Sequence, residues 1–149
     1  MPTFVALLRG INVGKAKRIP MAELRDVLTG LGYSGVATLL NSGNAVFRTT
    51  KATPARLATA ITEAISAHLE IDVPVIVKSA RELSAIVSGN SLAASAADHS
   101  RLLVAFAGDA KSLAGLKAIE RSVVRPERFE IGEHAAYLHC VNGILDSKA

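Results

Sequence analysis

The sequence is poor in the residues on which several protein classes depend. Its 149 residues include one cysteine, no tryptophan, four phenylalanines and two tyrosines. A lone cysteine, Cys140, excludes an internal disulfide and a cysteine-based metal cluster, and it fits a reducing compartment. Because aromatic side chains are scarce, aliphatic residues and alanine must fill the core. Half of the residues are hydrophobic, which suffices for a folded domain.

Long hydrophobic runs are also missing. No stretch approaches the ~20 apolar residues that a membrane-spanning helix needs. The N-terminal apolar run stops at Arg9 and no basic segment precedes it, so it does not resemble a signal peptide. We therefore expect a cytoplasmic protein with no membrane partner.

Acidic residues are absent from the segment in which basic ones gather. Residues 1–78 hold nine Lys and Arg against five Asp and Glu, whereas residues 79–149 hold eight of each, so the net charge of +4 belongs to the first part. Four of those nine bases lie in RGINVGKAKR, Arg9 to Arg18, which has no acid. This distribution indicates a local basic patch rather than a generally basic protein.

The first part of the chain predicts the order βαββαβ, a ferredoxin-like pattern. Apolar runs, turn residues and helical spacing of leucines and isoleucines mark its elements. The expected elements are a strand at 3–9, a helix after Pro20, strands at 36–40 and 45–49 joined by Asn41-Ser42-Gly43-Asn44, a helix capped by Thr53 and a strand at 73–78.

The second part begins the same order again and stops early. A connecting helix after Ser79 leads through a loop of small residues, 91–100, to a strand at 101–106. A helix capped by Asp109 and two strands, at 127–131 and 135–140, follow. We therefore predict an α+β fold of two ferredoxin-like halves in tandem, residues 1–78 and 79–149, the second incomplete.

The expected topology brings two distant loops together. In a βαβ unit the two strands run the same way, so their carboxyl ends lie at one edge of the sheet. The segments RGINVGKAKR and NSGN follow those two ends, beside the N-terminus of the first helix, which favours anions. We expect an anion-binding edge there.

The residue types at this edge suit a phosphate or carboxylate. Arg and Lys supply charge, Gly allows close backbone approach, and Asn and Ser supply hydrogen bonds. The candidate ligand-binding residues are Arg9, Gly10, Asn12, Gly14, Lys15, Asn41, Ser42 and Asn44, with further charge from Lys17 and Arg18. Ordinary turn chemistry could also account for these residues. Neither the Walker motif nor the dinucleotide motif is present, and no cofactor is expected.

Other chemistry finds little support in the sequence. His68, His99, His134 and His139 do not have metal-ligand spacing, so no metal site is expected. No serine or cysteine nucleophile has an evident base, and Cys140 is expected to be a buried apolar residue. Phe4 and Phe47 are expected in the core rather than on a base-stacking surface, which leaves only weak nucleic-acid contact by the basic loop.

A family resemblance rests on the same two segments. FVALLRGINVGKAKRIPMAELR, LGY and LNSGNAVF resemble the bacterial DUF1697 family, a domain of unknown function, with weaker likeness in SAREL and YLH. The resemblance implies two ferredoxin-like halves and no assigned activity. Many members have glycine in place of Lys15, and members usually continue into a helix and a T-x-R-N-W-like motif. This sequence shows neither the helix nor the motif. We therefore expect an uncovered sheet edge that a second copy of the chain could cover, as a homo-oligomer.

Three functional hypotheses follow. The first is a protein that binds a phosphate-bearing small molecule between the two loops. The second is an enzyme that acts there on a small phosphorylated or carboxylated metabolite, for which no general acid or base is identified. The third is a structural or subunit-interaction module, which predicts that Asn12 and Asn41 bond to backbone with no pocket between them.

Overall fold

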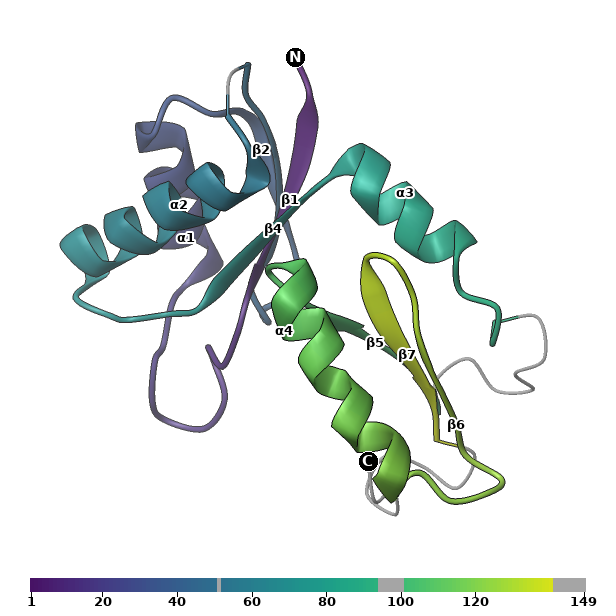
Figure 1. Ribbon diagram of the computed structural model, residues 1–149. Helices are drawn as coiled ribbons and strands as arrows, with labels where there is room; N and C mark the ends of the chain where they lie inside the picture. Colours follow the sequence, from purple (N-terminus) through teal and green to yellow (C-terminus); the bar gives the residue numbers. More distant parts are fainter. Residues whose placement is uncertain (51, 94–100, 141–149) are drawn as a thin grey trace. The chain divides into compact units, whose positions relative to one another are not determined.

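A computed structural model describes residues 1–50, 52–93 and 101–140. It has a mixed α+β architecture with two antiparallel sheets, of four and three strands (Figure 1). The chain divides into two compact units, residues 1–81 and 82–149. The α+β class is confirmed, whereas the tandem of two ferredoxin-like halves is not.

The first unit has the element order that its sequence predicts. The elements are β1 (Thr3–Leu8), α1 (Met21–Gly30), β2 (Ser34–Leu39), β3 (Asn44–Arg48), α2 (Pro54–Leu69) and β4 (Val75–Ser79). The strands lie in the order β2-β3-β1-β4, and each neighbouring pair is antiparallel. Because β1 and β2 both run antiparallel to β3, they run parallel to each other and end at the same edge of the sheet.

One face of this sheet forms the core of the first unit. Side chains alternate along β1, so that Phe4, Ala6 and Leu8 are buried beneath the two helices. Phe47 of β3 stacks on Phe4 with ring centroids 5.9 Å apart. The prediction that these two phenylalanines belong to the core is confirmed. Both helices pack against this face and against each other (Figure 1).

The second unit has a connecting helix and a smaller sheet. α3 (Ala80–Ser88) leads to β5 (Leu102–Phe106), then α4 (Ala110–Gly115), which continues as the 3₁₀ helix η2 (Leu116–Ser122), and finally β6 (Arg128–Ile131) and β7 (Ala135–His139). The strand order is β5-β7-β6. Residues 94–100 of the expected small-residue loop lie outside the described residues.

Local signals place these elements. The Thr53 Oγ1 accepts a hydrogen bond from the Arg56 N–H at 3.3 Å, and the Asp109 Oδ1 accepts one from the Ser112 N–H at 2.6 Å, so both predicted helix caps are confirmed. The Tyr137 hydroxyl of β7 donates to the carbonyl oxygen of Ile86 at 2.7 Å, which satisfies an acceptor near the end of α3. Cys140 is buried, as its sequence context predicts.

Candidate functional site

The carboxyl end of β1 is held on both sides. The Leu8 N–H donates to the Gly43 carbonyl oxygen at 2.9 Å, and the Arg9 N–H donates to the Pro74 carbonyl oxygen at 3.0 Å. The first bond joins β1 to the loop of residues 41–44, and the second joins it to the segment that precedes β4. The loop of residues 9–18 therefore starts from a fixed point beside the 41–44 loop.

The 9–18 loop is itself folded into a small hairpin. The Asn12 N–H donates to the Lys17 carbonyl oxygen at 3.1 Å, and Val13 and Ala16 form an isolated antiparallel bridge. Gly14 has a φ of +64°, while Lys15 has no positive φ, which matches a type II′ turn with glycine at its first central position. Lys15 consequently stands at the exposed tip of the hairpin.

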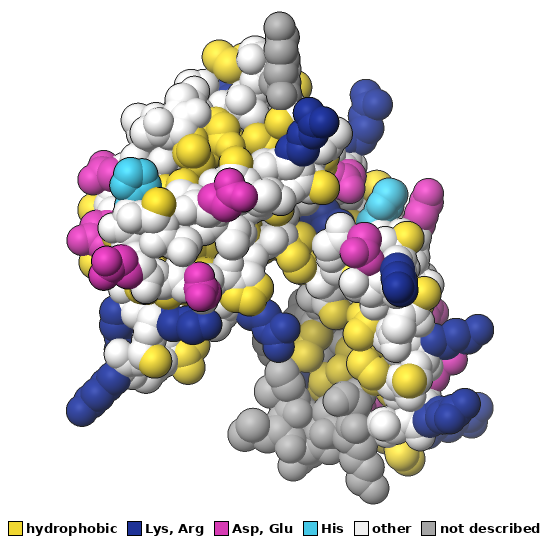
Figure 2. Space-filling model, turned by 60° about the vertical axis from the view of Figure 1, so that its left-hand side comes forward, with side chains coloured by type: hydrophobic (Ala, Val, Ile, Leu, Met, Phe, Trp, Pro, Cys, Tyr) yellow, Lys and Arg dark blue, Asp and Glu magenta, His cyan; other side chains and the backbone are white. Residues whose placement is uncertain are grey.

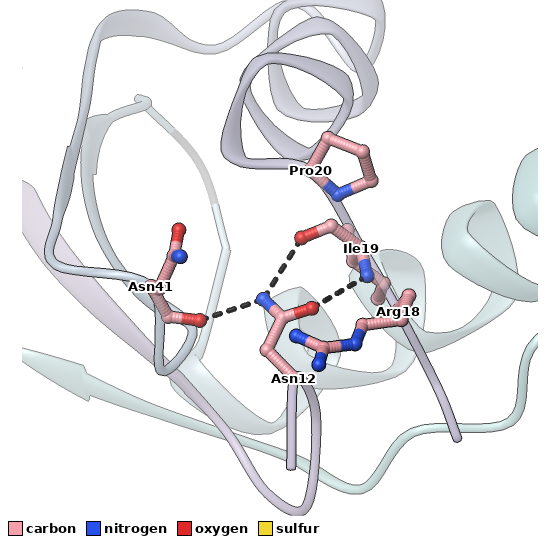
Figure 3. Close-up of a pocket in the computed structure, with 5 residues that line it drawn as sticks. All are labelled: Asn12, Arg18, Ile19, Pro20 and Asn41. Atoms are coloured by element: carbon pink, nitrogen blue, oxygen red, sulfur yellow. Dashed lines mark hydrogen bonds between the residues drawn. The ribbon is translucent and has the colours of Figure 1, made fainter. Parts of the chain in front are cut away.

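Asn12 joins the two loops and the start of α1 through both the nitrogen and the oxygen of its side-chain amide. Its Nδ2 donates to the carbonyl oxygens of Ile19 at 2.9 Å and Asn41 at 2.7 Å, and its Oδ1 accepts from the Ile19 N–H at 2.9 Å. Figure 3 shows these bonds, with the Asn41 side chain directed away from Asn12. The expected meeting of the two loops is thereby present in the structure.

Gly43 allows the two loops to approach this closely. A Cβ at this position would lie 2.7 Å from the Leu8 Cβ and 2.9 Å from the Ile11 Cδ1, and Gly43 has a φ of +97°. Both observations exclude an unstrained side chain. The glycine of NSGN is therefore required by packing as well as by the turn.

A hollow of about 200 Å³ lies where these segments meet, and we call it the loop hollow. Its lining residues are Asn12, Arg18, Ile19, Pro20 and Asn41 (Figure 3). Ile19 is buried, and Pro20 is the N-cap of α1. The Arg18 side chain lies beside Asn12 and is the charged group of the lining.

The other predicted site residues do not line the loop hollow. Ser42 and Asn44 interact with each other, since the Asn44 Nδ2 donates to the Ser42 Oγ at 3.2 Å. Arg9 and Lys15 are exposed, and Gly10 and Gly14 have positive φ angles with open space at the Cβ position. Of the eight predicted residues, Asn12 and Asn41 line the hollow.

Ile19 and Pro20 were not among the predicted site residues, and Arg18 was expected only to add positive charge. Their position depends on the hairpin of residues 12–17, which returns the chain to the start of α1. The available signal was Gly14, because a glycine inside a loop is typical of a tight turn.

The electrostatics of this edge favour an anion. The side chains of Arg9, Lys15, Lys17 and Arg18 are exposed, and neither their own loop nor residues 39–44 contain an acidic residue. At the N-terminus of α1 no side chain caps the free N–H groups, while Glu23 in the first turn partly offsets the helix dipole. The positive charge of the edge therefore comes mainly from the loop.

The rest of the described chain offers no metal site or membrane span. Across residues 1–50, 52–93 and 101–140, no three His, Cys, Asp or Glu side chains lie close enough to hold a metal ion. In the same ranges, none of the helices combines the length and the apolar character that crossing a bilayer requires.

Comparisons with known proteins give a family and a similar solved structure. None of the curated proteins matches the chain. Among solved structures, the conserved bacterial protein SP0830 from Streptococcus pneumoniae is similar, with a TM-score of 0.77 and 27% identity over 92% of this chain and 76% of that one. The family described as "Protein of unknown function (DUF1697)" matches residues 1–137. The chain thus belongs to the DUF1697 family.

Proposed function

We propose that the protein binds a phosphate-bearing ligand at the loop hollow. The observation that carries this proposal is a hollow lined by an unpaired arginine and two asparagines, with three more basic side chains in the adjacent loop. The volume of about 200 Å³ is below the ~300 Å³ at which pockets begin to enclose a whole small molecule. It suits one phosphate group, with the rest of the ligand outside.

The lining residues would have different roles in binding the phosphate group. Arg18 would form the bidentate contact with phosphate oxygens that its planar guanidinium favours. The Asn41 side-chain amide points away from Asn12 and would donate to the ligand. Asn12 has both N–H bonds and its oxygen engaged with backbone, so its role would be to position the loops rather than to touch the ligand.

Binding is better supported than catalysis. The lining residues include no Asp, Glu, His or Cys, and so no general acid or base lies against a ligand in the loop hollow. An enzyme that acts on a phosphorylated metabolite would need such a group from elsewhere. The enzyme hypothesis therefore has no candidate acid–base residue among those that line the loop hollow.

A structural role for the two loops has one observation in its favour. The module hypothesis predicts that Asn12 bonds to backbone, and it does so three times. The same hypothesis predicts no pocket between Asn12 and Asn41, whereas both residues line the loop hollow. The two roles are compatible, because a positioning residue can hold a binding site in shape.

The test is a thermal-shift measurement with inorganic phosphate, sugar phosphates and nucleotides. A ligand that binds only the folded chain raises the free energy of unfolding, by about 2.7 kcal/mol at a ligand concentration of 100 Kd, and so raises the Tm. We expect Arg18→Ala to abolish the rise, because it removes the charged group of the hollow. Arg18→Lys should keep part of it, since charge remains while the bidentate geometry is lost.

The matched control is Lys111→Ala. Lys111 is an exposed base of the second unit, on α4, and its replacement should leave the ligand-dependent rise in Tm unchanged. If the Arg18→Ala variant shows the same rise as the unaltered chain, the proposed site is wrong.

A further inference from the structure

Three large aliphatic side chains are exposed in the segments that lead into the loop hollow. Val13 is 73% exposed, Leu39 65% and Leu40 77%, and they are among seven large hydrophobic residues with exposed side chains in the described chain. Val13 directly follows Asn12 and Leu40 directly precedes Asn41, the two residues that a 2.7 Å hydrogen bond joins. The exposed aliphatic side chains therefore come from the 9–18 loop and from the end of β2 with the residue after it, two segments that this hydrogen bond joins.

Leu40 is held in a conformation that suits its side chain poorly. Its φ is +58°, in the left-handed region that bulky residues rarely adopt and that Asn or Gly adopts at lower cost. The fold thus places a leucine where both backbone strain and water exposure act against it. Neither cost is offset by packing, since the side chain is mostly in contact with solvent.

Positive charge accompanies these aliphatic residues. The 9–18 loop contributes Arg9, Lys15, Lys17 and Arg18, and neither it nor residues 39–44 contains an acid. Figure 2 shows Lys and Arg side chains with hydrophobic ones among them at the lower end of the first unit, where Figure 1 places the loop that follows β1. Exposed aliphatic side chains close in sequence to exposed basic ones match the chemistry of an anionic bilayer surface.

We propose that this edge docks on the surface of an anionic lipid bilayer, with Val13, Leu39 and Leu40 entering the interfacial layer and the basic residues facing lipid phosphates. The inference rests on the proposed function, because a lipid headgroup would supply the phosphate that the loop hollow receives. A peripheral contact needs no spanning helix. It differs from the expectation, drawn from sequence alone, that the protein has no membrane partner.

Two other macromolecular partners fit the edge less well. Single-stranded nucleic acid is bound by stacking of bases on aromatic side chains, and the two loops contain none. A peptide helix is bound in an apolar groove, whereas these aliphatic side chains are not among the residues that line the small loop hollow. A bilayer accepts isolated aliphatic side chains without requiring a complementary shape.

The experiment is co-sedimentation of the full chain with vesicles of phosphatidylcholine alone and of phosphatidylcholine mixed with phosphatidylglycerol. We expect binding to the mixed vesicles that falls at high salt, because screening weakens contacts between exposed charges. The variant Leu40→Asn should bind about tenfold more weakly, from the lost burial of one leucine side chain. The variant Lys15→Gln should bind about fivefold more weakly, from the loss of one charge near the surface.

Thermal unfolding separates docking from folding. Leu40→Asn should keep or raise the Tm, since asparagine tolerates the left-handed backbone better than leucine. A weaker vesicle interaction in a variant of equal or greater stability cannot come from misfolding. The matched controls are Val124→Asn and Lys111→Gln, an exposed aliphatic residue and an exposed base of the second unit, which should bind vesicles as the unaltered chain does.

Each contrary outcome identifies what is wrong. Equal binding to both kinds of vesicle, or full binding by Leu40→Asn, overturns the docking proposal. A rise in Tm with inorganic phosphate or soluble glycerophosphoglycerol, without any vesicle binding, overturns docking and leaves phosphate binding in place. Absence of both responses overturns both proposals. Binding of a short oligonucleotide that excludes vesicles would assign the edge to nucleic acid instead.

Discussion

Gly43 is the residue in the loop edge at which a single methyl group should have the largest effect. Its Cβ would lie 2.7 Å from the Leu8 Cβ, against a buried strand end, and its φ is +97°. We expect Gly43→Ala to lower the free energy of unfolding by about 2–4 kcal/mol, the sum of backbone strain and overpacking. Denaturant unfolding measures this change directly.

Gly14→Ala is the matched control for that prediction. Gly14 also has a positive φ, +64°, but nothing lies within 4 Å of its Cβ position. The control should therefore lose only the backbone term, about 1 kcal/mol. Equal losses in the two variants would show that the close approach to Leu8 contributes nothing.

At the residue scale, the residue types of the two loops did not reveal what each side chain contacts. The amides of Asn12 and Asn41 were both expected to face a ligand, yet Asn12 spends its amide on Ile19 and Asn41. Nothing in the residue type distinguishes these uses, because the same donors and acceptors serve backbone or ligand equally. The left-handed conformation of Leu40 was also hidden, since propensity would assign such a position to glycine or asparagine.

The start of α4 should respond to pH. The backbone N–H of Ser112 donates to the Asp109 carboxylate, and this bond lowers the pKa of Asp109 from its ordinary value of 3.8. Because the pKa is lower in the folded state, the stabilisation is present above the unfolded value and is lost as pH falls through the folded value. Asp109→Asn keeps a capping side chain without the charge, so its stability relative to the unaltered chain should improve on going from pH 7 to pH 2.

Unfolding by denaturant at a series of pH values checks this prediction. The Asp26→Asn variant is a suitable control, because Asp26 is an exposed acid on α1 away from its first turn. A stability difference for Asp109→Asn that stays constant from pH 7 to pH 2 would contradict the assignment of the cap.

At the element scale, strands and helices could be predicted because their signals are local. Alternation along Thr3–Leu8 and the caps at Thr53 and Asp109 each involve residues close in sequence, and the structure places all three where they were expected. The hairpin of residues 12–17 was not predicted. Its backbone pairing, Asn12 with Lys17 and Val13 with Ala16, spans too few residues to give a periodic pattern, and the bond that joins it to Asn41, 29 residues away, leaves no local signal.

For the whole molecule, the two units have separate cores. One core contains Phe47 and Leu28 of the first unit, and another contains Ile86 and Tyr137 of the second. Tyr137→Phe should cost about 1 kcal/mol, because it leaves the Ile86 carbonyl oxygen without its donor. The loss in a double variant with Gly43→Ala should equal the sum of the two single losses.

A double-mutant cycle measures that additivity. A coupling energy above about 0.5 kcal/mol would contradict independent effects of the two changes.

The division of the chain also explains why the candidate site could be predicted from the first unit alone. Both loops, the start of α1 and the strand ends that carry them fall within residues 1–81.

The three hydrogen bonds of the Asn12 side chain should affect how fast the proposed ligand binds and how much conformational entropy its binding costs. A receptor that is already in its bound shape spends little conformational entropy when a ligand arrives, and much of its contact energy then appears as affinity. Asn12 ties residues 12, 19 and 41 together without any ligand. For the proposed phosphate-bearing ligand, Asn12→Ala should therefore slow association, because the two loops would no longer be held together before the ligand arrives.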